Sequence, residues 1–184
     1  MSLTSEPRWH RHNRGPASLA RGPLRSWLLD RGSLTERLIK LSRGDFCVQV
    51  IRQEMSLPRP SEHAALGMGH RQLALIREVI LLGGGRPWVY ARSVIPQTSL
   101  SGRLRCLRKL DNRPLGALLF SDPHMRRGAI ELASQDTRHT PLPGPLQAIQ
   151  AVISGRRSLF WLDNKPLLVC EMFLPEFTPY NSPL

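Results

Sequence analysis

Two apolar segments separated by three consecutive glycines constrain the fold of this sequence most. Residues 72–82 (QLALIREVILL) and 87–95 (PWVYARSVI) are rich in branched and aromatic side chains, and the four residues GGGR join them. Such a short glycine-rich connection places two strands side by side in opposite directions. A second pair of segments, residues 157–162 and 166–173, surrounds Asp-Asn-Lys at 163–165 in the same way. The sequence therefore predicts two antiparallel hairpins.

The remaining pattern adds helices and shorter strands. Ser33 and Glu36 have the spacing of a capping box, which predicts a helix that begins at Leu34, and Pro114 suits the first turn of another helix. We also expect strands at 46–52 and 129–132, helices at 26–31 and 99–110, and loops at 58–69 and 134–155, the second loop with a short helical piece. About six strands in hairpins, with helices between them, predict a single α+β domain built on an antiparallel sheet.

The charge of the chain is strongly positive. Lysine and arginine total 26 against 14 acidic residues, which gives a net charge of +12. Nucleic-acid binding, arginine-rich codon usage and attraction of anionic substrates are all consistent with this balance. Because the arginines form no dense run and aromatic residues make up only 6%, we expect no specific nucleic acid as a partner.

Composition and cysteine spacing indicate the compartment. A hydrophobic content of 41% suits a globular core. No apolar run approaches the roughly 20 residues of a membrane span, and the N-terminus lacks an apolar signal core, so we expect a cytoplasmic protein. Cys47, Cys106 and Cys170 are far apart and odd in number, which favours neither a disulfide framework nor a metal site. We expect a basic, flexible extension at residues 1–22 and one domain at residues 23–184.

Two charged residues interrupt faces that otherwise have core character. Arg77 shares its strand face with apolar residues of 75–81, and Glu171 shares its face with apolar residues of 167–173. A buried charge requires a partner, so the two could form an ion pair with each other or with other residues. Alternatively both face a cavity, where the arginine would bind a ligand carboxylate and the glutamate would accept a proton or a hydrogen bond. The sequence leaves both interpretations open.

Common catalytic and cofactor motifs are missing. The sequence contains no G-x-G-x-x-G, P-loop or H-E-x-x-H motif, and the glycines at 83–85 suit a hairpin turn. Cys170 lies next to Glu171, but its neighbours on the same strand face are apolar, so we expect it to pack in the core. The first turns of the helices at Leu34 and Leu115 have backbone N–H groups that could bind an anion or be satisfied by caps and water.

Four segments together resemble the bacterial chorismate lyase family. They are the strand REVILLGGGR, its partner PWVYARSVIP, the segment RPLGALLF and the C-terminal KPLLVCEMFLP, and the resemblance spans residues 24–180. It implies a lyase that removes pyruvate from chorismate and leaves 4-hydroxybenzoate, the first committed step of ubiquinone biosynthesis. It also implies that no cofactor or metal is needed, and that helices cover an internal ligand cavity on a six-stranded sheet.

The resemblance assigns roles to four positions. Arg77 would bind the ring carboxylate, Glu171 would lie near the ring hydroxyl, and Leu34 and Leu115 would contribute binding contacts, so we expect Arg77 and Glu171 to be the catalytic residues. For the second carboxylate of the substrate we expect Arg92 or Arg127, because both occupy inward-looking positions. The proline-rich loop at 135–154 and the basic N-terminus depart from the family pattern.

A non-catalytic module is the alternative to a lyase. Effector domains of some bacterial transcription regulators resemble relatives of this fold and bind small molecules without turnover. The sequence feature against this alternative is the lack of a helix-turn-helix segment beside the core. We expect chorismate and 4-hydroxybenzoate as ligands, and a monomer.

Overall fold

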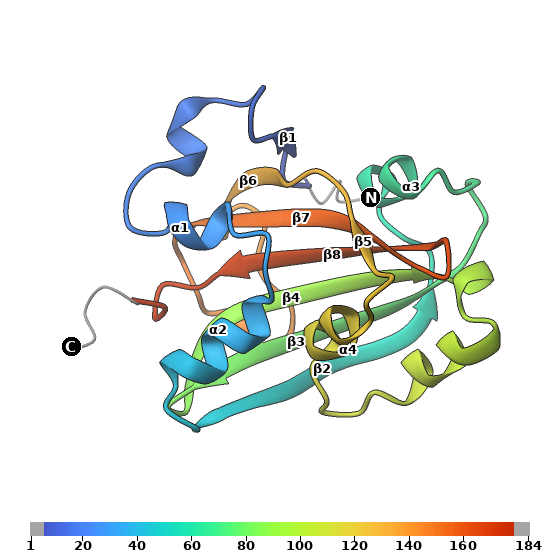
Figure 1. Ribbon diagram of the computed structural model, residues 1–184. Coiled ribbons are helices and arrows are strands. Elements are labelled where there is room, and N and C mark those ends of the chain that lie inside the picture. The colour runs from blue at the N-terminus through green and yellow to red at the C-terminus, as the bar shows by residue number, and fades with distance from the viewer. Residues whose placement is uncertain (1–5, 179–184) are drawn as a thin grey trace.

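The computed structural model describes residues 6–178 and contains one large antiparallel sheet (Figure 1). The strand order is β1-β6-β7-β8-β4-β3-β2, and β5 pairs with β7. The strands are β1 (His10–Arg11), β2 (Phe46–Ser56), β3 (Ala74–Gly83), β4 (Arg86–Pro96), β5 (Arg126–Arg127), β6 (Glu131–Asp136), β7 (Val152–Leu162) and β8 (Lys165–Phe173). The predicted α+β class with an antiparallel sheet is confirmed.

Both predicted hairpins are confirmed, and their turns explain their register. Gly84 and Gly85 join β3 to β4, and Asp163 and Asn164 join β7 to β8. All four residues have positive φ angles, between 50° and 71°. Two-residue turns of this kind match the twist of paired strands, and glycine, asparagine and aspartate adopt them at low cost. The turns fix which residues lie opposite each other along both hairpins.

The sheet has eight strands and not six, because two short strands add to the predicted set. β1 and β5 contain two residues each and form only through pairing with β6 and β7. Such short strands have no hydrophobic alternation that a sequence could reveal. The strand predicted at 129–132 lies further along the chain, at Glu131–Asp136.

Helices cover one face of the sheet, which we call the front face (Figure 1). It carries α1 (Arg25–Leu28), α2 (Leu34–Leu41) and α4 (Leu115–Ser121), whose apolar side chains join two buried clusters with the sheet. Ser33 caps α2 by accepting a hydrogen bond from the Glu36 N–H, at 3.2 Å, so the predicted start at Leu34 is confirmed. Pro114 is the N-cap of α4 and not its first residue. Residues 6–178 also contain the 3-10 helices η1 (Ala17–Ala20), η2 (Gln97–Ser99), η3 (Gly102–Lys109) and η4 (Gly144–Leu146).

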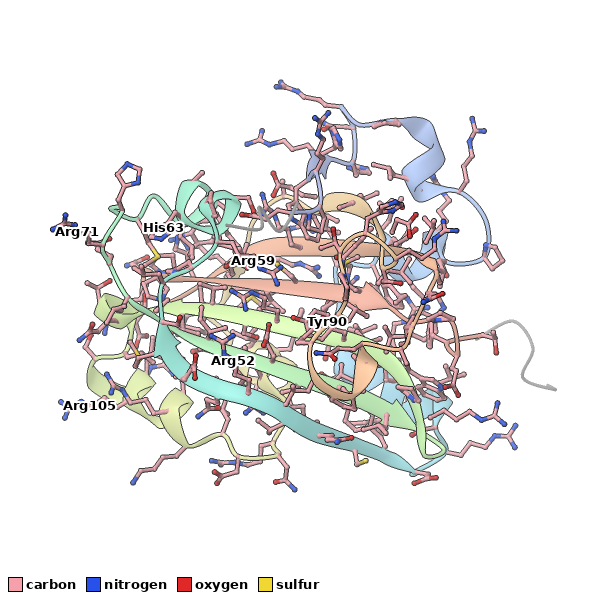
Figure 2. The ribbon with its side chains drawn as sticks, turned by 180° about the vertical axis from the view of Figure 1, so that it is seen from behind. Arg52, Arg59, His63, Arg71, Tyr90 and Arg105 are labelled. Carbon is pink, nitrogen blue, oxygen red and sulfur yellow. The ribbon has the colours of Figure 1, made fainter. Side chains whose placement is uncertain are left out.

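The opposite face, which we call the back face, is covered by α3 (Pro60–Leu66) and by residues 137–151 (Figure 2). The prediction of a loop at 58–69 is wrong. Pro60 occupies the first turn of α3, the Glu62 carboxylate accepts the Arg59 N–H at 2.8 Å, and Gly67 ends the helix in the left-handed conformation. The loop predicted at 134–155 is shorter than expected, because β6 and β7 extend into it.

The described part of the N-terminal segment packs against the domain. His10 and Arg11 pair with β6, the Glu6 carboxylate accepts the Ser61 N–H at 3.3 Å, and Ala20 is buried in the core. Residues 6–22 therefore add an edge strand to the sheet, whereas residues 1–5 lie outside the described part. Within residues 6–178, no helix has the length and apolar character needed to cross a membrane.

Candidate functional site

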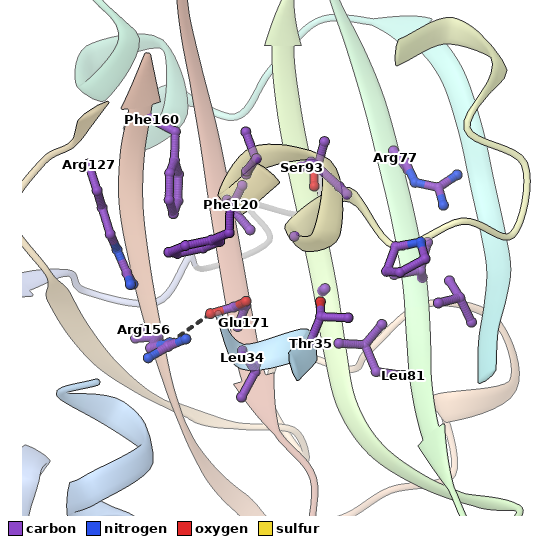
Figure 3. Close-up of a pocket in the computed structure, with 18 residues that line it drawn as sticks. Leu34, Thr35, Arg77, Leu81, Ser93, Phe120, Arg127, Arg156, Phe160 and Glu171 are labelled. Carbon is purple, nitrogen blue, oxygen red and sulfur yellow. Dashed lines mark hydrogen bonds and ion pairs between the residues drawn. The ribbon is translucent and has the colours of Figure 1, made fainter. Parts of the chain in front are cut away.

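A pocket lies on the front face, where the two buried clusters meet beneath α2 and α4 (Figure 3). Residues of β2, β3, β4, β7 and β8 form its floor, and the first turns of α2 and α4 form its roof. The lining residues are Leu34, Thr35, Val48, Arg77, Val79, Leu81, Ala91, Ser93, Pro114, Leu115, Gly116, Leu119, Phe120, Arg127, Arg156, Phe160, Val169 and Glu171. The predicted residues Leu34, Arg77, Leu115, Arg127 and Glu171 are thus brought together.

Arg77 lies at one end of the pocket, and only 2% of it is exposed. Its guanidinium donates hydrogen bonds to Gln53 Oε1 at 2.9 Å and to the Arg113 carbonyl at 3.0 Å. Both acceptors are neutral, and within residues 6–178 Arg77 forms no ion pair with a carboxylate. Burial lowers the pKa of Arg77, and the charge of Asp111 offsets part of that effect. A buried arginine without a counter-ion is a strong site for an anion.

Glu171 lies toward the other end and forms an ion pair with Arg156, with 2.6 Å between Glu171 Oε2 and Arg156 Nε. The two residues are directly opposite each other across β7 and β8. Arg77 and Glu171 do not contact each other; β4 separates their strands, which places them roughly 10 Å apart across the sheet. Of the two interpretations left open, the ion pair therefore applies to Glu171, with Arg156 as its partner, while both residues also face a common pocket.

Arg156 was missed from the sequence. The predicted strand began at residue 157, one residue after Arg156, although the hairpin register pairs 156 with 171. Counting residue pairs outward from the turn at Asp163 and Asn164, one pair beyond the predicted strand, would have placed Arg156 opposite Glu171. Arg156 is 1% exposed, and its Nη1 also donates to the carbonyls of Trp27 and Asp30, both at 2.7 Å.

Arg127 is the third arginine of the pocket. It donates to Ser158 Oγ at 3.2 Å and to the carbonyls of Asp30 and Gly32 at 3.1 and 3.4 Å, and it lies 5.1 Å above the Phe160 ring. Burial, together with the charge of Arg156, lowers its pKa to about 10. It is still charged at neutral pH, and its hydrogen-bond acceptors are all neutral.

Arg92 does not reach the pocket, which corrects the expectation that it could bind a ligand carboxylate. β4 is buried on both faces, and Arg92 points to the back face. There it binds Glu62 through Nε at 2.7 Å and Glu78 through Nη1 at 2.8 Å, and Tyr90 also donates to Glu78. Figure 2 shows Tyr90 on this face. Two carboxylates already neutralise Arg92, so it has no free charge for a ligand.

Cys170 also points to the back face, and it is buried in the core, as predicted from its apolar neighbours. Burial raises the pKa of its thiol to about 12, so the thiol is protonated at neutral pH and is not a nucleophile. Within residues 6–178, no group of histidine, cysteine and acidic side chains could hold a metal ion.

The roof of the pocket depends on close packing of two helix starts. A side chain on Gly116 would place its Cβ 2.6 Å from Thr35 Oγ1, so only glycine allows α2 and α4 to approach this closely. Leu34 and Leu115 begin these helices and line the pocket. The first residues of both helices therefore belong to the pocket wall.

The pocket combines charge with apolar walls. The charged groups in its lining are three arginines and one glutamate, a net charge of +2. Phe120 and Phe160 stand edge to face on one wall, with ring centroids 6.1 Å apart, and leucines and valines supply most of the rest. Such a site suits a flat, dianionic ligand with a small number of polar groups.

The chain is similar to known proteins over most of its length. The family model for chorismate lyase matches residues 9–180. A relative from Marinobacter nauticus, named "Probable chorismate pyruvate-lyase", is 44% identical over 162 residues, which cover 88% of this chain and 80% of the relative. A relative of the same name from Thiobacillus denitrificans is 42% identical over 156 residues, with 83% and 82% covered.

Among solved structures, the effector domain of PhnF from Mycobacterium smegmatis has a TM-score of 0.56 at 17% identity, covering 80% of this chain and 91% of that domain. At this identity the likeness shows a shared fold and nothing more. The family match extends over nearly the whole described chain and is supported by relatives above 40% identity; the chain belongs to the chorismate lyase family of enzymes.

Proposed function

We propose that this protein converts chorismate to 4-hydroxybenzoate and pyruvate, the first committed step toward ubiquinone. The observation that carries the proposal is the pocket itself, with a net charge of +2, apolar walls, and Arg77 and Glu171 at separate ends. Chorismate is a dianion with a six-membered ring and a ring hydroxyl. Its charge and shape are complementary to such a lining.

Arg77 and Glu171 fix the orientation of the ring in this proposal. Arg77 binds the ring carboxylate, which replaces the neutral acceptors Gln53 and the Arg113 carbonyl with a charged one. The backbone N–H groups at Leu34 and Leu115, in the roof, add donors near the ligand. Glu171 accepts a hydrogen bond from the ring hydroxyl.

Arg127 binds the second carboxylate, that of the enolpyruvyl group. It lines the same pocket as Glu171 and has only neutral acceptors in the described structure. A carboxylate would be a stronger acceptor than these, and would also offset the repulsion between Arg127 and Arg156. Arg77 and Arg127 would then hold one carboxylate each.

The chemistry is an elimination that the protein assists by positioning. The ether bond between the ring and the enolpyruvyl oxygen breaks, and the ring carbon that carries the hydroxyl loses a proton. The enolpyruvyl methylene gains a proton, so the leaving group departs as pyruvate and the ring becomes aromatic. Aromatisation supplies the driving force, and no redox equivalent is consumed. The protein holds a reactive conformer and stabilises the charge that develops on the leaving oxygen.

Turnover of chorismate tests the proposal, because the aromatic product can be followed by its absorbance. Arg77→Ala and Glu171→Ala should each lower kcat/KM by at least about a hundredfold, since each removes a charged contact to the substrate. Arg86→Ala and Glu176→Ala are the matched controls, because both residues are exposed and lie outside the pocket. Circular dichroism checks that all four variants are folded. Near-normal turnover of the two pocket variants would refute the assignment.

A non-catalytic module of the same fold remains the rival function. It would bind 4-hydroxybenzoate or chorismate but release no pyruvate from wild-type protein. The proposed enzyme also binds its product, because the product retains the carboxylate and the hydroxyl that Arg77 and Glu171 recognise. We also propose that the protein acts as a monomer in the cytoplasm.

A further inference from the structure

Arg156 lines the pocket, but none of the ligand contacts proposed above involves it. It is one of the two largest side chains that are almost fully buried, with 1% exposed, the other being Arg77. Arg77 has neutral partners, whereas Arg156 uses Nε to bind Glu171 Oε2 at 2.6 Å. A buried arginine is costly to desolvate, so its contacts should serve more than local packing.

The second group of contacts connects Arg156 to the roof of the pocket. Its Nη1 donates to the carbonyls of Trp27 and Asp30, both at 2.7 Å, in the segment that leads from α1 into α2. Three residues after Asp30, Ser33 caps α2, whose first turn lines the pocket. One planar guanidinium therefore fixes both the carboxylate on the floor and the backbone that places the roof.

The two carboxylate oxygens of Glu171 differ in their hydrogen bonds. Oε2 is taken by Arg156, and within residues 6–178 Oε1 has no hydrogen-bond partner. The side chain of Glu171 is 17% exposed, and it lines the pocket next to Arg156 (Figure 3). A carboxylate with one oxygen held in this way cannot rotate freely, so the other oxygen has a fixed direction.

We propose that Arg156 is a positioning residue that makes the pocket selective for a hydrogen-bond donor at the para position of an aromatic acid. By holding Oε2, it leaves Oε1 as an acceptor for the ring hydroxyl of substrate and product. This inference rests on the proposed function and adds to it the residue that sets the ring-hydroxyl contact. Arg156 itself touches no reacting atom.

A purely structural ion pair is the competing explanation. In that case Arg156 would neutralise Glu171 and stabilise the hairpin, without effect on ligand preference. The two explanations differ in one quantity, the ratio of affinities for 4-hydroxybenzoate and for benzoate, which lacks the hydroxyl. Stability alone does not change that ratio.

Arg156→Lys provides the test, because lysine keeps the charge but cannot bind Glu171 and two carbonyls in one plane. Titration calorimetry with 4-hydroxybenzoate and benzoate should show that the variant loses about tenfold or more of the preference of wild type for the hydroxylated acid, with benzoate affinity nearly unchanged. With chorismate, kcat should fall more than KM rises.

The matched control is Arg157→Lys. Arg157 is the next residue, points to the back face and pairs with Glu131 at 2.6 Å, so its variant should keep the wild-type ratio.

A second measurement on wild-type protein does not depend on folding of a variant. If Oε1 is a fixed acceptor, 4-hydroxybenzoate and 4-aminobenzoate should bind more tightly than benzoate and 4-methoxybenzoate, which have no donor at that position. Equal affinities for all four, or an Arg156→Lys variant that keeps the full preference, would overturn the role of Arg156. Wild-type protein that neither turns over chorismate nor binds 4-hydroxybenzoate would instead refute the proposed function, and this inference with it.

Discussion

The three arginines of the pocket differ in the acceptors that they hold without ligand. Arg156 is bound to a carboxylate, whereas Arg77 and Arg127 donate only to neutral oxygens among residues 6–178. Neutral acceptors are weaker partners than carboxylates. Arg77 and Arg127 are therefore the two cations available to a dianion, and they lie toward different ends of the pocket (Figure 3).

Arg127→Gln tests the contact to the second carboxylate. We expect KM for chorismate to rise by about tenfold or more, because a charge-assisted hydrogen bond is lost. Affinity for 4-hydroxybenzoate should change much less, since the product lacks the enolpyruvyl carboxylate. Arg126→Gln is the control, because Arg126 is exposed and bonds Asn164 outside the pocket. Equal losses of substrate and product affinity in Arg127→Gln would show that the residue does not distinguish the two carboxylates.

The alternation of residues along a strand identified Arg77 and Glu171 but could not resolve Arg92. β3 and β4 are buried on both faces, so neighbouring residues along these strands all appear to point into a core. Which of the two faces holds the pocket depends on where α2 and α4 pack. That is a tertiary property, and a charged residue on either face has the same local sequence pattern.

At the scale of elements, α3 is a helix that the composition of its segment did not predict. Residues 58–69 contain prolines, glycines and polar side chains, which led to the prediction of a loop. The helix signals were present: Pro60 in the first turn, Glu62 as the third helical residue and Gly67 at the C-cap. Because the helix has only seven residues, the prolines and glycines in and around it outweighed these signals in the prediction. Packing against β8 stabilises the helix in the folded protein.

Glu62 attaches α3 to the sheet and makes stability depend on pH. Burial alone would raise the pKa of Glu62, but hydrogen bonds and charge from Arg92 outweigh burial and lower the pKa below its ordinary value of 4.5. The ionised form is thus favoured in the folded protein. The contribution of ionised Glu62 to the free energy of unfolding is fully present above pH 4.5, and it is lost as pH falls through the lower pKa of the folded state.

Glu62→Gln should lower the free energy of unfolding at pH 7 by about 3 kcal/mol, because Arg92 loses one of its two buried partners. Urea unfolding at several pH values measures this difference, which should narrow as pH falls below 4.5, because the unfolded wild type then binds a proton that the folded protein does not. Glu36→Gln is the control, since the Glu36–Lys40 pair is exposed and contributes little. A difference in the free energy of unfolding that stays constant as pH falls below 4.5 would contradict this role for Glu62.

At the scale of the whole molecule, local signals predicted six strands of the sheet, but neither the two short strands β1 and β5 nor the site. The two hairpins followed from turn chemistry, and the α+β class followed from counting strands and helices. The pocket forms where two buried clusters from distant parts of the chain meet, which no local pattern contains. The resemblance of motifs supplied the roles of Leu34, Arg77, Leu115 and Glu171, and the structure brings these positions to one pocket.

The segment at 137–151, between β6 and β7, lies on the face of the sheet opposite the pocket. Its leucines, with Ile149, cover the back face, where they pack against β3, β4, β7 and β8. None of its residues lines the front-face pocket. The segment therefore adds to the core on one side of the sheet, while the charged groups of the pocket lie on the other.

The central claim is that Arg77 and Glu171 hold opposite ends of one aromatic acid. A crystal structure with bound 4-hydroxybenzoate tests it most directly. We predict the carboxylate of the ligand within hydrogen-bond distance of the Arg77 guanidinium, and its hydroxyl within hydrogen-bond distance of Glu171 Oε1. A ring bound in the reverse orientation, or outside the pocket beneath α2 and α4, would contradict the account.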